Sequence, residues 1–320
     1  MTPGSSDASA VARRSLAQRC SGFAREQDLD PAGSAGSYDG FALVELPLPW
    51  PGEITEHPTL VPVAPMLKDA GVRVQGLVPR DSSAPDDRRV VWFTRPEGAF
   101  DRYRATAWSV VDDRVTGALA ALVASGGSDG GPATDVPVAG RHVLVCTHGR
   151  RDACCGTLGT RLAVALPGLG AGVHVWRTSH TGGHRFAPTA LLLPEGTLWA
   201  YLDLDRLVGI SDRTLDVDEA AGLYRGCAGL GGPEVQAAER EALRAVGWSW
   251  FEHRRRGRVM EIDGDRTRVR LDAESPDGRR LAFEATVEVA RLVPVPECGK
   301  PVSEAKKSAP ELRVSGFAAA

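Results

Sequence analysis

An apolar strand that ends in a cysteine and leads into a polar loop and a helix is the feature that most constrains the fold. Residues 141–146 read RHVLVC, and the helical pattern begins near Cys155. A second apolar stretch, 173–179, follows that helix and has the composition of a strand. The order strand, helix, strand predicts a βαβ unit with parallel strands, so we expect an α/β fold.

The two loops of this unit carry thiols and imidazoles. Cys146 ends the first strand, and Cys155 lies at the helix start, where the helix dipole lowers a thiol pKa. His180 and His184 follow the second strand and flank two glycines, which allow the loop to bring both imidazoles together. Because these loops meet at one edge of a parallel sheet, the four residues form a candidate Cys2His2 site.

The ligand types leave two metal centres open. Zn²⁺ accepts such a set, and the three residues between His180 and His184 fit structural zinc sites. The eight residues between Cys146 and Cys155 exceed the usual cysteine spacing of those sites. A [2Fe–2S] cluster is larger, tolerates a longer loop and accepts two cysteines with two histidines in Rieske-type ligation.

Longer strings around these residues resemble a known family. The strings CTHGRRDACCG (146–156), SHTGGHRFAPTALLLPEG (179–196) and YRGCAGL (224–230) are similar to the sucrase/ferredoxin-like family, over roughly residues 15–235. The resemblance implies a thioredoxin-like ferredoxin domain that binds a [2Fe–2S] cluster through Cys146, Cys155, His180 and His184. It also implies one-electron transfer, with an unidentified reductase and an unidentified electron acceptor as partners.

Histidine ligation would affect the redox potential. An oxidised cluster with two thiolates and two neutral imidazoles is formally neutral, whereas four thiolates leave it doubly negative. Reduction gives the histidine-ligated cluster a formal charge of −1. This negative charge should raise the pKa values of the imidazoles of His180 and His184. We expect the potential to fall as pH rises between the pKa values of the oxidised and reduced forms.

The chain divides into five parts. We expect an N-terminal tail and lead-in (1–40), an N-terminal α/β half without a cluster (41–125), a linker (126–140), the thioredoxin-like [2Fe–2S] ferredoxin domain (141–235) and a C-terminal α+β extension (236–320). The linker is identified by its Gly, Ser, Asp and Pro residues. In the extension, a helical segment precedes alternating segments that predict antiparallel strands.

The N-terminal half and the ferredoxin domain have the same predicted order of elements: strand, helix, strand, hairpin and helix. The string LVELPLP aligns with VLVCTHG, and Pro-Glu-Gly recurs at 96–98 and 194–196. We infer a degenerate duplication of a thioredoxin-like unit. The first copy has Leu46 where the second has Cys146, so only the second is expected to hold a cluster.

Composition excludes several function classes. The net charge of −3 argues against nucleic-acid binding, and no apolar window is long enough to predict a membrane span. The N-terminal residues contain no apolar signal core, so we expect a cytoplasmic protein. Six cysteines in such a chain favour metal or redox chemistry over a disulfide framework. The oligomeric state stays open.

Two other functions compete with the electron carrier. One is a non-redox, zinc-stabilised binding module that uses the same Cys2His2 set. The other is a thiol oxidoreductase that uses Cys154 and Cys155. No catalytic residue is assigned, and an electron carrier is favoured over a stand-alone enzyme.

The remaining polar and sulfur-containing residues receive structural interpretations. Cys20, Cys227 and Cys298 have no ligand spacing and read as inert small hydrophobes. His148 reads as a loop histidine without a metal contact. The basic run 253–258 is interpreted as a solvated face, 217–230 as a helix, and the segment after Cys298 as a tail.

Overall fold

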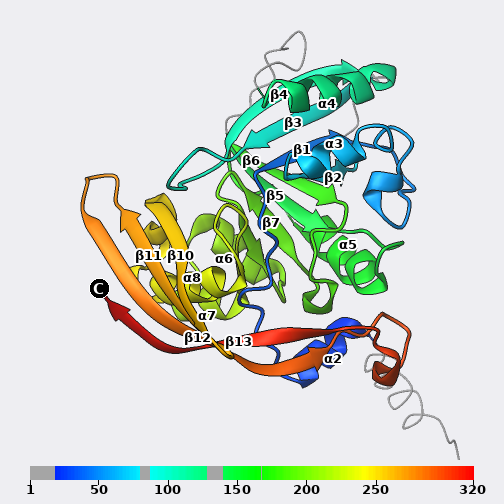
Figure 1. The fold of residues 1–320 in the computed structure, drawn as a ribbon. Helices are drawn as coiled ribbons and strands as arrows, with labels where there is room; N and C mark the ends of the chain where they lie inside the picture. Colours follow the sequence, from blue (N-terminus) through cyan, green and yellow to red (C-terminus); the bar gives the residue numbers. More distant parts are fainter. Residues whose placement is uncertain (1–18, 80–86, 128–139, 167) are drawn as a thin grey trace, which may run out of the picture.

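The computed structural model describes residues 19–79, 87–127, 140–166 and 168–320. The tail expected at 1–18 and most of the linker expected at 126–140 lie outside these ranges. The described chain forms a mixed α/β fold with a nine-stranded mixed sheet and a four-stranded antiparallel sheet (Figure 1).

The nine-stranded sheet has the order β4-β3-β1-β2-β6-β5-β7-β8-β9. Its strands are β1 (Gly40–Glu45), β2 (Val72–Leu77), β3 (Asp87–Thr94), β4 (Arg104–Val111), β5 (Arg141–Cys146), β6 (Val173–Thr178), β7 (Ala190–Leu193), β8 (Thr197–Trp199) and β9 (Tyr224–Cys227). Strands β1 and β5 are mostly apolar and are buried on both faces.

The strands of the two halves follow the same order. β1 pairs in parallel with β2 and antiparallel with β3, which pairs with β4. β5 likewise pairs in parallel with β6 and antiparallel with β7, which pairs with β8. The Pro-Glu-Gly sequences at 96–98 and 194–196 lie in the β3–β4 and β7–β8 connections. A single antiparallel residue pair, Leu77 with Thr178, joins β2 to β6 and makes one sheet of both halves.

Helices cover the sheet and connect its strands. They are α2 (Cys20–Glu26), α3 (Ala64–Asp69), α4 (Val115–Ala124), α5 (Thr160–Ala165), α6 (Leu204–Asp212), α7 (Val217–Leu223) and α8 (Pro233–Val246), with short turns η1 (Ile54–Glu56), η2 (Asp112–Arg114), η3 (Cys155–Gly159), η4 (His184–Phe186), η5 (Trp248–Glu252) and η6 (Val302–Glu304). The helix expected after β5 is confirmed: η3, a π-helical turn, leads into α5. None of the helices in the described ranges is both long and apolar enough to cross a bilayer.

The C-terminal sheet curves around α8 (Figure 1). Its strands, β10 (Arg254–Asp263), β11 (Arg266–Glu274), β12 (Arg280–Pro294) and β13 (Ser308–Ala319), pair in sequence order. Alternate residues of β11 are buried, as expected for a sheet with one face on the core. Strands β12 and β13 are longer than the other two, and their paired ends extend beyond β11 and run alongside α2 (Figure 1). There Arg291 donates to the Gln27 carbonyl oxygen.

Three expectations about elements are wrong. The segment 217–230 is not one helix, because α7 ends at Leu223 and the next residues form strand β9. The segment after Cys298 is not a tail, because it contains β13. The basic run 253–258 is not uniformly solvated: His253 and Arg255 are buried, and the Arg255 guanidinium donates to the buried carboxylate of Glu239 at 2.6 Å.

Candidate metal centre

The end of β5 and the start of η3 bring Cys146 and Cys155 together. A Cβ atom on Gly159 would collide with the carbonyl oxygen of Cys146, so glycine at this position lets the helix start pass directly over the strand end. Asp152 caps that helix start by accepting from the backbone N–H of Cys154 at 2.8 Å and from that of Cys155 at 3.4 Å. Both cysteines of the proposed set are fully buried.

His180 joins these two thiols. Its Nδ1 atom lies 3.8 Å from the Cys146 Sγ atom, and one donor atom each of Cys146, Cys155 and His180 lie within 4.8 Å of one another. Cys155, rather than its neighbour Cys154, is therefore the thiol that faces Cys146. We call this set the first thiol group.

His184 lies at the border of this group. Its ring centroid is 6.0 Å from that of His180, but its Nδ1 atom faces the Asp152 carboxylate at 3.1 Å and the Cys20 Sγ atom at 3.2 Å. The structure thus brings three of the four expected ligands into one group and places the fourth beside it, with Nδ1 directed toward Asp152.

A second thiol group includes the Asp152 carboxylate. Its other members are Cys20, Cys154 and Cys298. The Sγ atom of Cys298 is 2.9 Å from that of Cys154 and 3.3 Å from that of Cys20. The sequence predicts Cys20 and Cys298 to be inert small hydrophobes without ligand spacing, but the fold brings both thiols into a group that could hold a metal ion. Cys227 does stay apart from both groups, with its thiol donating to the Glu195 carbonyl oxygen.

His148 supports the first group without joining it. Its Nε2 atom is 2.7 Å from the Pro51 carbonyl oxygen, so this nitrogen carries the proton. Its Nδ1 atom then accepts from the backbone N–H of His180 at 3.3 Å. Burial lowers the pKa of His148, which keeps this ring neutral and able to accept. His148 therefore positions the His180 backbone.

Arg225, from the YRGCAGL string, holds the glycine-rich histidine loop. Its buried guanidinium donates to the Gly182 carbonyl oxygen at 3.1 Å and to the Ser34 carbonyl oxygen at 2.6 Å. Gly183 has φ of +65°, and a Cβ atom there would lie 2.5 Å from the Arg225 Cζ atom. Burial lowers the Arg225 pKa to about 10, so the residue is still cationic at neutral pH.

The N-terminal half also holds this loop, although it supplies no thiol or imidazole to either group. The Arg73 guanidinium donates to the His180 carbonyl oxygen at 2.8 Å. The Ser179 hydroxyl accepts from the Gly76 backbone N–H at 3.0 Å, and the Ser179 N–H donates back to the Gly76 carbonyl at 2.8 Å. The first half is thus part of the scaffold that fixes the position of His180.

Hydrogen bonds divide protons unequally within the first group. The pKa of Cys146 is well below its usual value, because the Cys155 thiol and the His180 ring hydrogen-bond its thiolate and outweigh the opposing effect of burial. The pKa of Cys155 is raised by the same hydrogen bond and by burial. This hydrogen bond thus favours the thiolate at Cys146 over that at Cys155, and a bound cation would favour the thiolate form of both.

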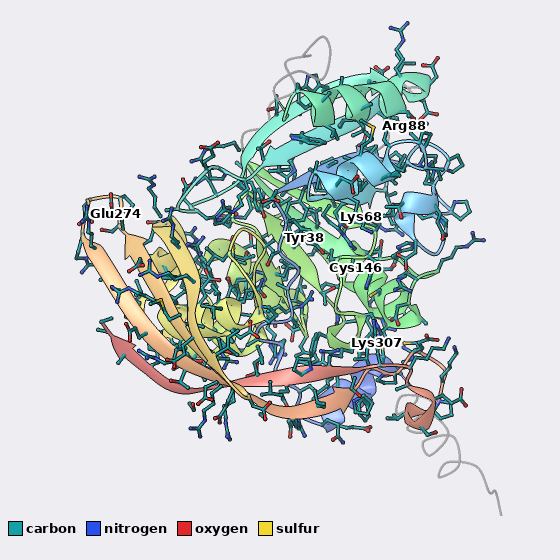
Figure 2. The ribbon with its side chains drawn as sticks, in the orientation of Figure 1. Tyr38, Lys68, Arg88, Cys146, Glu274 and Lys307 are labelled. Atoms are coloured by element: carbon teal, nitrogen blue, oxygen red, sulfur yellow. The ribbon has the colours of Figure 1, made fainter. Side chains whose placement is uncertain are left out.

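A cavity of about 500 Å³ opens beside the second thiol group. Its walls include His184, Cys298 and two acidic residues, Asp152 and Glu297. Four basic residues also line it: Arg150, Arg151, Lys306 and Lys307. Figure 2 labels Cys146 at the sheet edge and Lys307 in the C-terminal segment. Solvent and ions can therefore reach the edge of the thiol groups through a basic opening.

Asp152, Cys20 and Cys298 are the site residues that the sequence interpretation missed. Asp152 lies inside the CTHGRRDACCG string, so its local position as the residue before the helix start could have identified it. No local signal marks Cys20 or Cys298, because each meets the loop only through the tertiary fold.

Buried thiols and imidazoles that converge at the edge of a mixed sheet define an α/β protein with candidate metal-binding groups. The sucrase/ferredoxin-like family model matches residues 31–226, and the chain belongs to this family. The match spans the whole first thiol group, whereas Cys20 and Cys298 lie beyond its limits. No curated protein and no solved structure matches the chain.

Proposed function

We propose that this protein is a one-electron carrier with a [2Fe–2S] cluster held by Cys146, Cys155, His180 and His184. The observation that carries the proposal is the convergence of Cys146, Cys155 and His180 within 4.8 Å, in a chain of the sucrase/ferredoxin-like family. When bound, the cluster supplies the one-electron chemistry. The protein supplies ligation, burial and docking.

The donor set fits such a cluster. Two thiols and one imidazole already face one another, and thiolates with imidazoles are the ligands of Rieske-type centres. The hydrogen bond from the His184 ring to Asp152 uses Nδ1 and leaves Nε2 for a metal. A carboxylate that holds the outer nitrogen of a histidine is the usual partner of a metal-binding imidazole.

The surrounding residues support the negative charge of the thiolates. Cys146 and Cys155 are fully buried, so water does not compete for their sulfur atoms. The buried Arg225 cation lies close enough to interact electrostatically with both of them. Arg225 and Arg73 together hold the backbone of the histidine loop from two sides, at Gly182 and His180.

We also infer that both halves of the nine-stranded sheet are thioredoxin-like units, related by the degenerate duplication. Their shared strand order, their shared strand directions and the matched Pro-Glu-Gly turns support this inference. On this interpretation the first unit has kept a scaffold role, since Leu46 replaces Cys146 at the end of its first strand.

The partners we propose are an electron donor and an electron acceptor with acidic docking faces. The four basic residues of the cavity, Arg150, Arg151, Lys306 and Lys307, lie beside His184 at the edge of the thiol groups. A positive patch at this place would steer an anionic partner toward the cluster.

A thiol oxidoreductase that uses Cys154 and Cys155 as a pair receives less support. Although adjacent in sequence, the two side chains face different groups: Cys155 faces Cys146, whereas Cys154 faces Cys298. A zinc-stabilised module would use the same four ligands. Measurement of the bound metal distinguishes this function from that of an electron carrier.

The metal content of anaerobically purified protein tests the proposal. We expect about two iron and two acid-labile sulfide atoms per chain, with visible absorption. Cys146→Ser should abolish that absorption. Cys227→Ser, the matched control at a buried cysteine outside both groups, should keep it. Zinc at the first group, without iron, in protein made under iron-replete conditions would contradict the electron-carrier function.

A further inference from the structure

We propose that Cys20, Cys154, Cys298 and Asp152 form a second metal site, separate from the first thiol group, which binds one Zn²⁺ ion. The first thiol group is not needed for this inference, because the two groups share no donor atom. The proposal concerns ligands from three distant parts of the chain: the start of α2, the loop before η3 and the connection between β12 and η6.

The geometry suits a tetrahedral ion. Zinc–sulfur bonds are about 2.3 Å long, so two thiolates on one zinc ion lie about 3.8 Å apart. The Cys298 Sγ atom is 2.9 Å from that of Cys154 and 3.3 Å from that of Cys20. Shifts of less than about 1 Å would therefore admit the ion. Asp152 supplies the fourth donor, with Oδ1 at 3.5 Å from the Cys298 Sγ atom.

The donor types select the metal. Three thiolates favour a soft or borderline ion, and zinc also accepts a carboxylate oxygen. Four anionic donors exceed the charge of one divalent cation. The basic residues of the adjacent cavity, among them Arg150 and Lys306, offset part of that excess. The same cavity reaches Cys298 and Asp152 from solvent and provides an entry path for the ion.

Polar neighbours complete the surroundings of this site. The Ser21 hydroxyl donates to the Cys154 Sγ atom at 3.1 Å, as expected beside a metal-bound thiolate. Asp152 faces the second group with both carboxylate oxygens. Its Oδ1 atom is 3.5 Å from the Cys298 Sγ atom and its Oδ2 atom is 3.5 Å from the Cys20 Sγ atom, and Oδ2 also faces the His184 ring. Its carboxylate thus contacts both the proposed zinc site and His184, a proposed ligand of the cluster.

A disulfide between Cys154 and Cys298 is the competing explanation for their short separation. All six cysteines are free thiols in the structure. A disulfide would also leave Cys20 and Asp152 without a reason to converge on the same point, whereas a metal ion uses all four donors.

The test counts zinc and iron separately in protein purified anaerobically from medium replete in both metals. We expect about one zinc per chain in the wild type. Cys298→Ser, at the half-buried and outermost ligand, should lose zinc and keep iron and sulfide. Cys146→Ser should lose iron and keep zinc, and Cys227→Ser should keep both metals. Circular dichroism establishes that each variant is folded.

A cobalt spectrum tests the site independently of the cluster. Cys146→Ser protein without a cluster is colourless. After a chelator has removed its zinc, Co²⁺ added to it should produce the strong visible bands of tetrahedral thiolate coordination. The double variant Cys146→Ser/Cys298→Ser should lose those bands. The proposal is overturned if wild-type protein holds no zinc and zinc-free Cys146→Ser protein gives no such spectrum with Co²⁺. Loss of iron together with zinc in Cys298→Ser, or a Cys154–Cys298 disulfide found by mass spectrometry, would overturn it as well.

Discussion

Gly183 shows how one residue controls the position of two imidazoles. Its φ of +65° is costly for other residues, and a Cβ atom would press on the Arg225 guanidinium. We expect Gly183→Ala to displace the histidine loop and to lower the iron content several-fold. The free energy of unfolding should fall by about 1–3 kcal/mol. Iron analysis and urea unfolding measure these two effects.

Gly264→Ala is the matched control for this substitution. Gly264 has φ of +56°, but no atom lies within 4 Å of the Cβ position. It therefore carries the backbone cost of the left-handed conformation without the collision. Equal iron content in the two variants would show that the contact with Arg225 does not position the loop.

The local sequence identified part of the site and could not identify the rest. Cys146, Cys155 and His180 converge as predicted, because a βαβ unit brings its two loops to one sheet edge. Cys298 is 144 residues from its partner Cys154, and its approach depends on the course of β12. The link between reduction and protonation of the histidine ligands stays a prediction.

Among the elements, α8 and the C-terminal sheet are joined by a buried ion pair. Glu239 accepts from Arg255 at 2.6 Å and from the Tyr224 hydroxyl at 2.7 Å, and both charged side chains are almost fully buried. Glu239→Gln should lower the free energy of unfolding by about 3–5 kcal/mol, because it leaves the Arg255 charge buried without a counter-ion. Denaturant unfolding measures the change.

An exposed pair provides the comparison for Glu239. Glu219 on α7 pairs with Arg206 at 2.9 Å, and both side chains are partly open to solvent. Glu219→Gln should cost about 0–1 kcal/mol. A loss from Glu239→Gln as small as that from Glu219→Gln would show that Arg255 finds compensation elsewhere.

Helices and strands are predicted correctly where the apolar pattern of the segment itself is clear. The apolar runs of β1 and β5 are unambiguous, and both strands are confirmed. Strand β9 follows α7 without a turn residue, so the apolar spacing of the helix continues into the strand. Strand β13 contains Ala, Gly and Pro and owes its conformation to pairing with β12 rather than to propensity.

At the scale of the whole molecule, the first half of the nine-stranded sheet contacts the candidate site in the second half. Sequence similarity between them predicted a half without a cluster. It could not predict that Arg73 and Gly76 of that half contact the histidine loop of the other. This arrangement arises because β2 pairs with β6 next to the end of β6, where the loop begins.

The charge distribution of the whole molecule leads to a kinetic prediction. Dithionite, an anionic reductant, should reduce the proposed cluster several-fold more slowly in Lys306→Glu/Lys307→Glu protein than in the wild type at low ionic strength. Both lysines line the cavity and are exposed, so reversing them weakens attraction of the anion. The difference should shrink at about 1 M salt, where the Debye length is about 3 Å. Stopped-flow absorbance measures the rates.

Lys68→Glu controls for the effect of net charge, since it makes half of the charge change of the double reversal. Lys68 is exposed on α3, in the first half, and takes no part in the cavity (Figure 2). Its reversal should leave the rate close to that of the wild type. If Lys68→Glu slowed reduction by about half as much as the double reversal on a logarithmic scale, overall charge rather than the cavity would govern the approach of the reductant.

The meeting of Cys20, Cys154 and Cys298 also sets an order of events during synthesis. Cys298 leaves the ribosome only after both halves of the nine-stranded sheet, so the second thiol group is assembled last. A chain that terminates early presents Cys20 and Cys154 without their third partner. Completion of this group therefore depends on synthesis through Cys298.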